Sequence, residues 1–297
     1  MTEPRHKTGA IPTVTRKLIG VAITAALVAS AGCVPKDRDP LQIVIAVDTS
    51  ASIARPSEEQ AFDSIQLSMR SFGRRDSVVI VPITGDAWND SQRNIIRDGL
   101  SEAREPYDED LRRFAARIRK ALEAMRADAM KEPARSTDVL GAVDVAAEEL
   151  AHGGDKKVSG HTPSLTRALI LLSDFIQDDA KFNFKTDPRL ANPRSARHLA
   201  AKLAEASKPR FQRVKVYLGY LASMDGRHLS NERREAIQAF WTGYLAGRGA
   251  EVEWAIDGPG RLVQFMTALR EDAEKVHTVP TLAHLFLRLR RSDAANH

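Results

Sequence analysis

The sequence predicts an α/β fold in which a doubly wound, mostly parallel sheet has helices on both faces. Two observations lead to this prediction. Short apolar runs rich in β-branched residues alternate along the chain with amphipathic segments of about 10 to 20 residues, and these runs are apolar throughout rather than at every second position. Strands of that kind are buried on both sides, and helical crossovers join them in parallel. The fold class is therefore Rossmann-like.

Two buried strands and a helix open the predicted domain. Residues 41–47 (LQIVIAV) and 77–83 (SVVIVPI) are the strands, because both are short, apolar and β-branched. Between them, residues 57–72 intersperse apolar and polar side chains as a surface helix does. Residues 85–106 are polar and rich in turn-forming residues, so we expect a loop there that carries one short edge strand around residue 95.

The rest of the domain continues the alternation. The clearest helix is 108–130, where Leu111, Phe114, Ile118, Leu122 and Met125 recur every three or four residues. The other expected helices are 138–150, 194–207, 230–247 and 260–275, and the other expected strands are 168–175, 213–221 and 252–256. These elements define one domain, residues 41–275, followed by a weakly patterned tail, residues 276–297.

The N-terminus has the features of an export signal, residues 1–32. Four basic residues and one acidic residue precede a 15-residue apolar run that ends at Cys33. The run is too short for a typical transmembrane helix of about 20 residues but suits a signal-peptide core. Its end, Ser30-Ala31-Gly32-Cys33, resembles a bacterial lipobox, which implies lipidation of Cys33. An ordinary signal peptide or a plain membrane anchor is the alternative interpretation.

Cysteine usage and charge agree with this interpretation. Cys33 is the only cysteine, so the chain forms no internal disulfide and no cysteine-based zinc site. Residues 33–40 are short and charged, as expected of a tether between membrane and domain. Of the formal net charge of +5, four of the 44 basic and one of the 39 acidic residues precede Cys33, which leaves +2 for the rest. We therefore expect no nucleic-acid partner.

Oxygen-bearing side chains follow two predicted strands and open one predicted helix. Asp48, Ser50 and Ser52 follow the first strand, Asp174 lies at the end of the strand 168–175, and Thr137 precedes the helix that starts at residue 138. In doubly wound sheets, ligands bind beyond the carboxyl ends of the strands, where the topology switches direction. The sequence thus predicts one site built from three separate loops.

These residues resemble the metal-ion-dependent adhesion site of von Willebrand factor type A (VWA) domains. Asp48, Ser50 and Ser52 match its D-x-S-x-S element, Thr137 is similar to its separate threonine, and Asp174 looks like its second aspartate. The resemblance spans about residues 41–258 and implies a VWA-like fold with these five residues as metal ligands. Phe175 replaces the glycine that usually follows the second aspartate, and we expect it to narrow the approach of a ligand.

The resemblance also implies a cofactor and a partner. Magnesium takes six oxygen ligands, keeps some waters and is satisfied by few carboxylates, so Mg²⁺ (or Mn²⁺) is the expected ion. In VWA domains the open position on the metal takes an acidic side chain from a protein ligand. The function expected is therefore a Mg-dependent protein-binding module, for adhesion or as a scaffold. Its location is the bacterial cell envelope, lipid-anchored at the outer membrane or periplasmic face, and it is not an enzyme.

Other interpretations of the same residues stay open at the level of the sequence. Asp48 and Ser50 also suit a strand end or helix cap, and Thr137 also suits the N-cap of the following helix. The segment Asp48-Thr49-Ser50-Ala51 also resembles the start of a PIN-like metal-dependent nuclease. Such an enzyme needs three or four clustered carboxylates, for which Asp86, Asp144 and Asp174 are the candidates.

Overall fold

The computed structural model describes residues 39–101, 103–131, 133, 136–152, 165–208, 210–255 and 258–275. The expected signal peptide, Cys33, most of the tether and the C-terminal tail lie outside these residues. The boundaries 33–40 and 276–297 therefore remain predictions.

Six strands form one sheet in the order β3-β2-β1-β4-β5-β6. Their bounds are β1 Leu41–Asp48, β2 Ser77–Ile83, β3 Ile96–Gly99, β4 Thr166–Ser173, β5 Val214–Tyr220 and β6 Glu251–Ala255. All neighbouring pairs are parallel except β2 and β3. This is the strand order of a doubly wound sheet, in which the direction of winding reverses between β1 and β4. The predicted fold class is confirmed.

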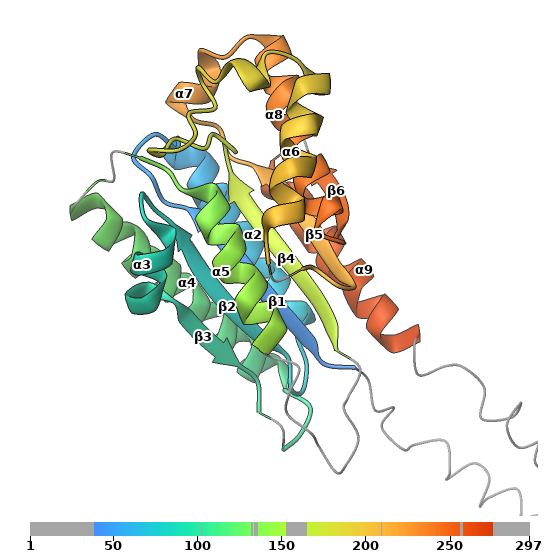
Figure 1. The fold of residues 1–297 in the computed structure, drawn as a ribbon. Coiled ribbons are helices and arrows are strands. Elements are labelled where there is room, and N and C mark those ends of the chain that lie inside the picture. The colour runs from blue at the N-terminus through green and yellow to red at the C-terminus, as the bar shows by residue number, and fades with distance from the viewer. Residues whose placement is uncertain are drawn as a thin grey trace, which may run out of the picture. The chain divides into compact units, whose positions relative to one another are not determined.

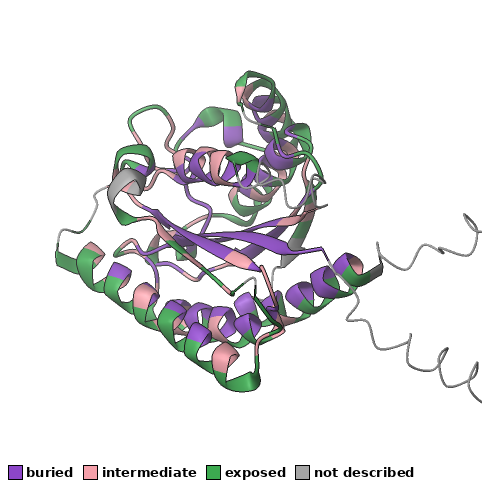
Figure 2. Cartoon of the chain, turned by 90° about the horizontal axis from the view of Figure 1, so that it is seen from below, coloured by how far each residue is buried: buried purple, intermediate pink, exposed green. Residues whose placement is uncertain are grey.

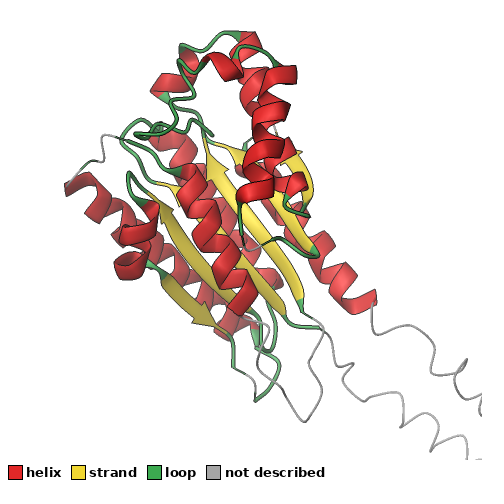
Figure 3. Ribbon diagram, in the orientation of Figure 1, coloured by secondary structure: helices red, strands yellow, loops and turns green. Residues whose placement is uncertain are grey.

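Helices cover both faces of the sheet (Figures 1 and 3). The helices are α2 Arg55–Ser68, α3 Ala87–Asn94, α4 Asp108–Lys131, α5 Val139–His152, α6 Pro193–Ala206, α7 Met224–Arg227, α8 Asn231–Gly247 and α9 Leu262–Lys275. One apolar core joins the sheet to α3, α5, α6 and α8, and a second joins it to α2, α4 and α9. Short 3-10 turns occupy Met69–Ser71, Pro188–Leu190 and Pro259–Arg261.

The central strands are the most deeply buried part of the chain, and Figure 2 shows the sheet lying between two helical layers. Every residue of β1 is buried, and along it Ile43 faces one core while Val44 faces the other. This explains why the strand is apolar without alternation, since both of its faces meet helices. Among the described residues no helix combines the length and apolar character needed to cross a membrane.

The structure contains two short helices that the sequence does not predict. We expected a loop with an edge strand over 85–106, and the edge strand exists as β3, but α3 precedes it. No element is predicted for residues 222–229, where α7 makes a single turn. Both lie near the carboxyl end of the sheet, and α7 contributes directly to the site.

Candidate metal centre

The loop that follows β1 presents the D-x-S-x-S side chains. Asp48 is the last residue of β1 and is fully buried. The Ser50 amide donates to its Oδ1 (2.9 Å), and the Ser173 hydroxyl donates to its Oδ2 (2.8 Å). The Ser50 and Ser52 hydroxyl oxygens lie 3.0 Å apart and are partly exposed. The carboxylate is therefore fixed, and two hydroxyls lie together on the solvent side of the loop.

Asp174 follows β4, the strand that pairs with β1 at the point where the winding reverses. It is 6% exposed. Its Oδ1 accepts the Ile176 amide (3.0 Å), and the Ser223 hydroxyl also hydrogen-bonds the carboxylate. Ser223 is fully buried and caps α7 by accepting the Gly226 amide (2.8 Å). The single-turn helix α7 thus holds the second carboxylate in place.

Backbone contacts tie the first loop to the loop after β5. The Ala54 amide donates to the Ala222 carbonyl (2.7 Å), and the Met224 amide donates to the Ser52 carbonyl (2.9 Å). Ile53 also forms an isolated bridge with Ser223. The Ser50–Ser52 turn and the residue that holds Asp174 therefore move as one unit.

The two carboxylates destabilise each other's charged form. Burial, followed by the negative charge of Asp48, raises the pKa of Asp174 to about 7, against the lowering effect of its hydrogen bonds with Ser223 and Ile176. Burial also raises the pKa of Asp48, against its hydrogen bonds from Ser50 and Ser173. Buried like charges need a compensating partner to stay ionised. A divalent cation fits this pair, since hard cations prefer carboxylate and hydroxyl oxygens.

Thr137 lies beside the loop that carries Asp174. It forms an antiparallel bridge with Asp178, in which each amide donates to the other residue's carbonyl (2.8 and 2.9 Å). The cap of α5 is the next residue, because the Asp138 Oδ1 accepts the Gly141 amide (2.8 Å). The interpretation of Thr137 as a plain N-cap is therefore wrong, which leaves its hydroxyl available for another role.

Phe175, which we expect to narrow the approach of a ligand, follows Asp174 and points into the core. Its side chain is fully buried in the core beneath α8, with its ring centroid 6.3 Å from that of Trp241. Its φ of 63° lies in the left-handed region that glycine adopts easily, and its carbonyl accepts the Trp241 Nε1–H (2.9 Å). The turn after Asp174 thus has a glycine-like backbone, while the side chain contributes to packing.

The three carboxylates of the nuclease hypothesis do not come together. Asp144 forms an ion pair with Arg248 (2.5 Å), and the exposed Asp86 bonds the Asn89 side chain (2.6 Å). Within the described part of the chain, no three Asp, Glu, His or Cys side chains are grouped so as to hold a metal. The site predicted here is of another kind, with two carboxylates and three hydroxyls.

Sequence reasoning missed the two serines that hold the carboxylates. Ser173 was included in a strand, and Ser223 was not singled out, although both are fully buried. A polar residue at the apolar end of a strand was the available signal for Ser173. Ser223 gave no such signal, because its role depends on a contact with Asp174, 49 positions earlier in the chain.

Comparisons with known proteins find similar chains among solved structures. No protein-family model matches the chain, and no curated protein matches it. Solved structures that it is similar to include a von Willebrand factor type A protein from Catenulispora acidiphila (13% identity, TM-score 0.38, 80% of this chain and 42% of that one). Another is manganese-loaded Plasmodium vivax TRAP, with 11% identity and a TM-score of 0.39 over 78% of this chain and 74% of that one. A third is the human COPII-coat protein Sec24c, with 13% identity and a TM-score of 0.39 over 81% of this chain and 32% of that one.

The chain spans less than half of the first and third of these structures. At such identities and TM-scores, the case for a metal site rests on the side chains described above.

Proposed function

We propose that this chain is a Mg-dependent protein-binding module and not an enzyme. Asp48, Ser50, Ser52, Thr137 and Asp174 would hold one Mg²⁺ (or Mn²⁺). When bound, the ion supplies positive charge for an acidic side chain of a protein partner. The observation that carries the proposal is the pair of buried carboxylates, Asp48 and Asp174, beside two clustered hydroxyls at the switch point of the sheet.

The chain's own residues prepare such a site in advance. Asp48 is oriented by two donors and Asp174 by two others, so neither carboxylate has to be ordered when a cation binds. Mg²⁺ takes six oxygen ligands, so a dication held by two carboxylates and three hydroxyls would keep one coordination position for a carboxylate of the partner. That combination favours the capture of a carboxylate over hydrolysis, which in metal enzymes needs a placed general base or a second metal.

We further propose that the module acts at the bacterial cell envelope, held to a membrane by a lipid on Cys33. The basic residues at the N-terminus and the apolar run that ends at Cys33 support this location.

Titration of magnesium chloride into the purified, EDTA-treated and dialysed protein tests the proposal. We expect saturable heat for about one site and a rise in melting temperature, because a ligand that binds only the folded state stabilises it. Absence of both effects with magnesium and with manganese would refute the metal site.

The nuclease hypothesis is tested on the same preparation. We expect single- and double-stranded nucleic acids to remain intact with magnesium or manganese. Metal-dependent cleavage that disappears in Asp48→Ala would favour the nuclease instead.

A further inference from the structure

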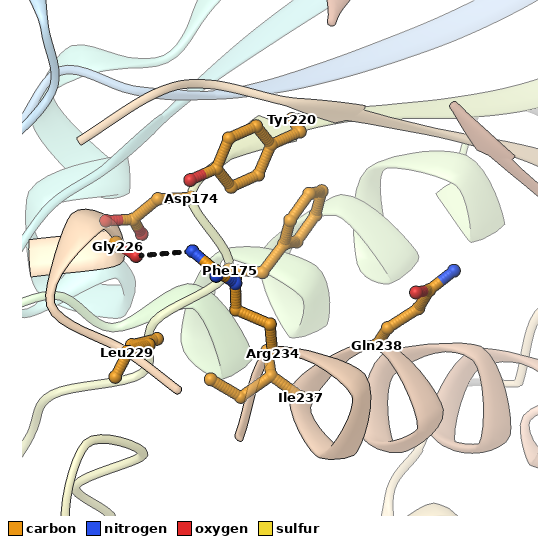
Figure 4. A pocket seen from close by; sticks show the side chains of 8 residues that line it. All are labelled: Asp174, Phe175, Tyr220, Gly226, Leu229, Arg234, Ile237 and Gln238. Carbon is orange, nitrogen blue, oxygen red and sulfur yellow. Dashed lines mark hydrogen bonds between the residues drawn. The ribbon is translucent and has the colours of Figure 1, made fainter. Parts of the chain in front are cut away.

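A cavity of about 240 Å³ opens directly beside Asp174 (Figure 4). Phe175, Leu229 and Ile237 supply its apolar surface, and Tyr220 and Arg234 supply polar groups at its edge. Asp174 belongs both to this cavity and to the candidate metal centre. The cavity and the candidate metal centre are therefore adjacent.

Besides Asp174, which the candidate metal centre would use, the charged group of the cavity lining is Arg234, so the lining suits an anionic segment with an apolar side chain. The Arg234 guanidinium donates to the Gly226 carbonyl (3.4 Å) and the Asn231 Oδ1 (2.5 Å). Among the described residues its acceptors are thus neutral, and its positive charge remains for a ligand. Leu229 is only partly buried, between α7 and α8, so the apolar surface is reachable from solvent. The volume suits one side chain of the size of leucine or phenylalanine.

We propose that this cavity receives an apolar side chain of the same partner segment that supplies the metal-binding carboxylate, and that Arg234 attracts the segment's negative charge. The inference rests on the proposed function. It names the partner's chemistry as an acidic residue with an apolar residue within two positions. In an extended segment, side chains two residues apart point to the same side at a spacing of roughly 7 Å, so one segment can place an acidic and an apolar side chain in two adjacent sites.

Selection of phage-displayed random heptapeptides on the purified protein tests the inference. Binding is carried out in magnesium chloride and bound phage are eluted with EDTA. The eluted sequences are expected to contain Asp or Glu with Leu, Ile, Val, Met or Phe within two positions. The strongest peptide is then synthesised and its affinity measured for three forms of the protein: wild type, Leu229→Gln and Leu67→Gln.

The two variants make the same chemical change, leucine to a neutral polar residue, at a half-buried position in the cavity lining (Leu229) and at an exposed position on α2 outside that lining (Leu67). We expect Leu229→Gln to weaken the peptide roughly ten-fold, as loss of apolar burial of one side chain implies, and Leu67→Gln to leave it unchanged. Magnesium affinity without peptide should be the same in all three forms.

The failures of the two proposals are distinguishable. Suppose that the protein binds magnesium, but that EDTA elutes no peptides or only peptides without an apolar preference. This result would overturn the cavity inference and leave the metal site standing. Equal peptide affinity in Leu229→Gln and Leu67→Gln would also overturn the cavity inference and leave the metal site standing. A wild-type dimer in sedimentation that Leu229→Gln dissociates would show a second copy as the occupant and overturn the inference. Absence of magnesium binding refutes the proposed function itself.

Discussion

Asp48 and Asp174 are nearly excluded from water, and donors orient each carboxylate. Replacing either by alanine should abolish magnesium binding, because the site has only these two carboxylates. The fold should survive, and without metal its stability should rise slightly, because one of two repelling charges is gone. Calorimetric titration measures the binding, and circular dichroism checks the fold.

Asp86→Ala is the matched control for these variants. Asp86 also follows a strand, β2, but it is exposed and bonds Asn89, so magnesium binding should be unchanged. Wild-type affinity in both Asp48→Ala and Asp174→Ala would mean that no site of this kind exists.

The raised pKa of Asp174 predicts how stability depends on pH. In the metal-free folded chain this pKa is about 7, compared with an ordinary value of 3.8, because the group is buried and lies near Asp48. The folded state therefore holds a proton that the unfolded chain releases, and this stabilisation is lost as the pH rises from about 4 to 7. In EDTA the melting temperature should fall over that interval.

Magnesium competes with the same proton, so its affinity should increase from pH 6 to 8. Asp174→Asn removes the titrating group and serves as the control for stability, since its melting temperature in EDTA should change less over the interval. If the melting temperature of wild type and of Asp174→Asn depended on pH in the same way, this would argue against a raised pKa of Asp174.

At single positions, the sequence marks the candidate ligands but not the residues that hold them. Asp48, Ser50 and Ser52 are recognisable because they follow a strand in a short, spaced pattern. The partners of the two carboxylates, Ser173 and Ser223, come from β4 and from the turn before α7. Their contacts exist only after distant segments have packed, and no local pattern encodes them.

At the scale of elements, the start of α5 separates metal binding from helix capping. Thr137→Ala should weaken magnesium binding with little loss of stability, because the cap of α5 is Asp138. Asp138→Ala should instead destabilise the protein by about 1 kcal/mol and leave magnesium binding nearly intact. Urea denaturation without metal measures stability, and calorimetry measures binding. The opposite assignment of the two effects would show that Thr137 has a structural role only.

Elements with a continuous apolar pattern are predicted well, and the two short helices α3 and α7 are not. The strands β1 and β2 and the helix α4 lie within one or two residues of their predicted bounds, since each has a continuous apolar pattern. The sequence of α3, AWNDSQRN, is mostly polar, and Ala87 is the one residue in the apolar core among those of α3 whose burial is described, so periodicity gives no signal. The four-residue α7 depends on the Ser223 cap and on backbone contacts with the Ser50–Ser52 turn. Such helices are specified by their surroundings.

At the scale of the molecule, the doubly wound topology explains why three sequence regions meet at one place. β1 and β4 are neighbours in the sheet although more than 100 residues separate them, so Asp48 and Asp174 reach the same edge. The turn before α7 reaches that edge because β5 lies beside β4 and runs parallel to it. The sequence therefore predicts the site through the fold, since only the strand order converts these distant residues into neighbours.

The last prediction concerns the whole chain in the cell. Cys33→Ser should release the mature domain from the membrane fraction or leave the precursor unprocessed, because Cys33 is the only thiol and lies at the end of the apolar run. Fractionation of cells that express either form, with detection of the protein and of its processed size, measures the outcome. Asp86→Ala serves as a control, since it alters an exposed residue of the domain and should stay membrane-bound. A Cys33→Ser protein that is processed and as firmly membrane-bound as wild type would exclude a lipid on this residue. Another part of the chain would then have to hold the protein at the membrane.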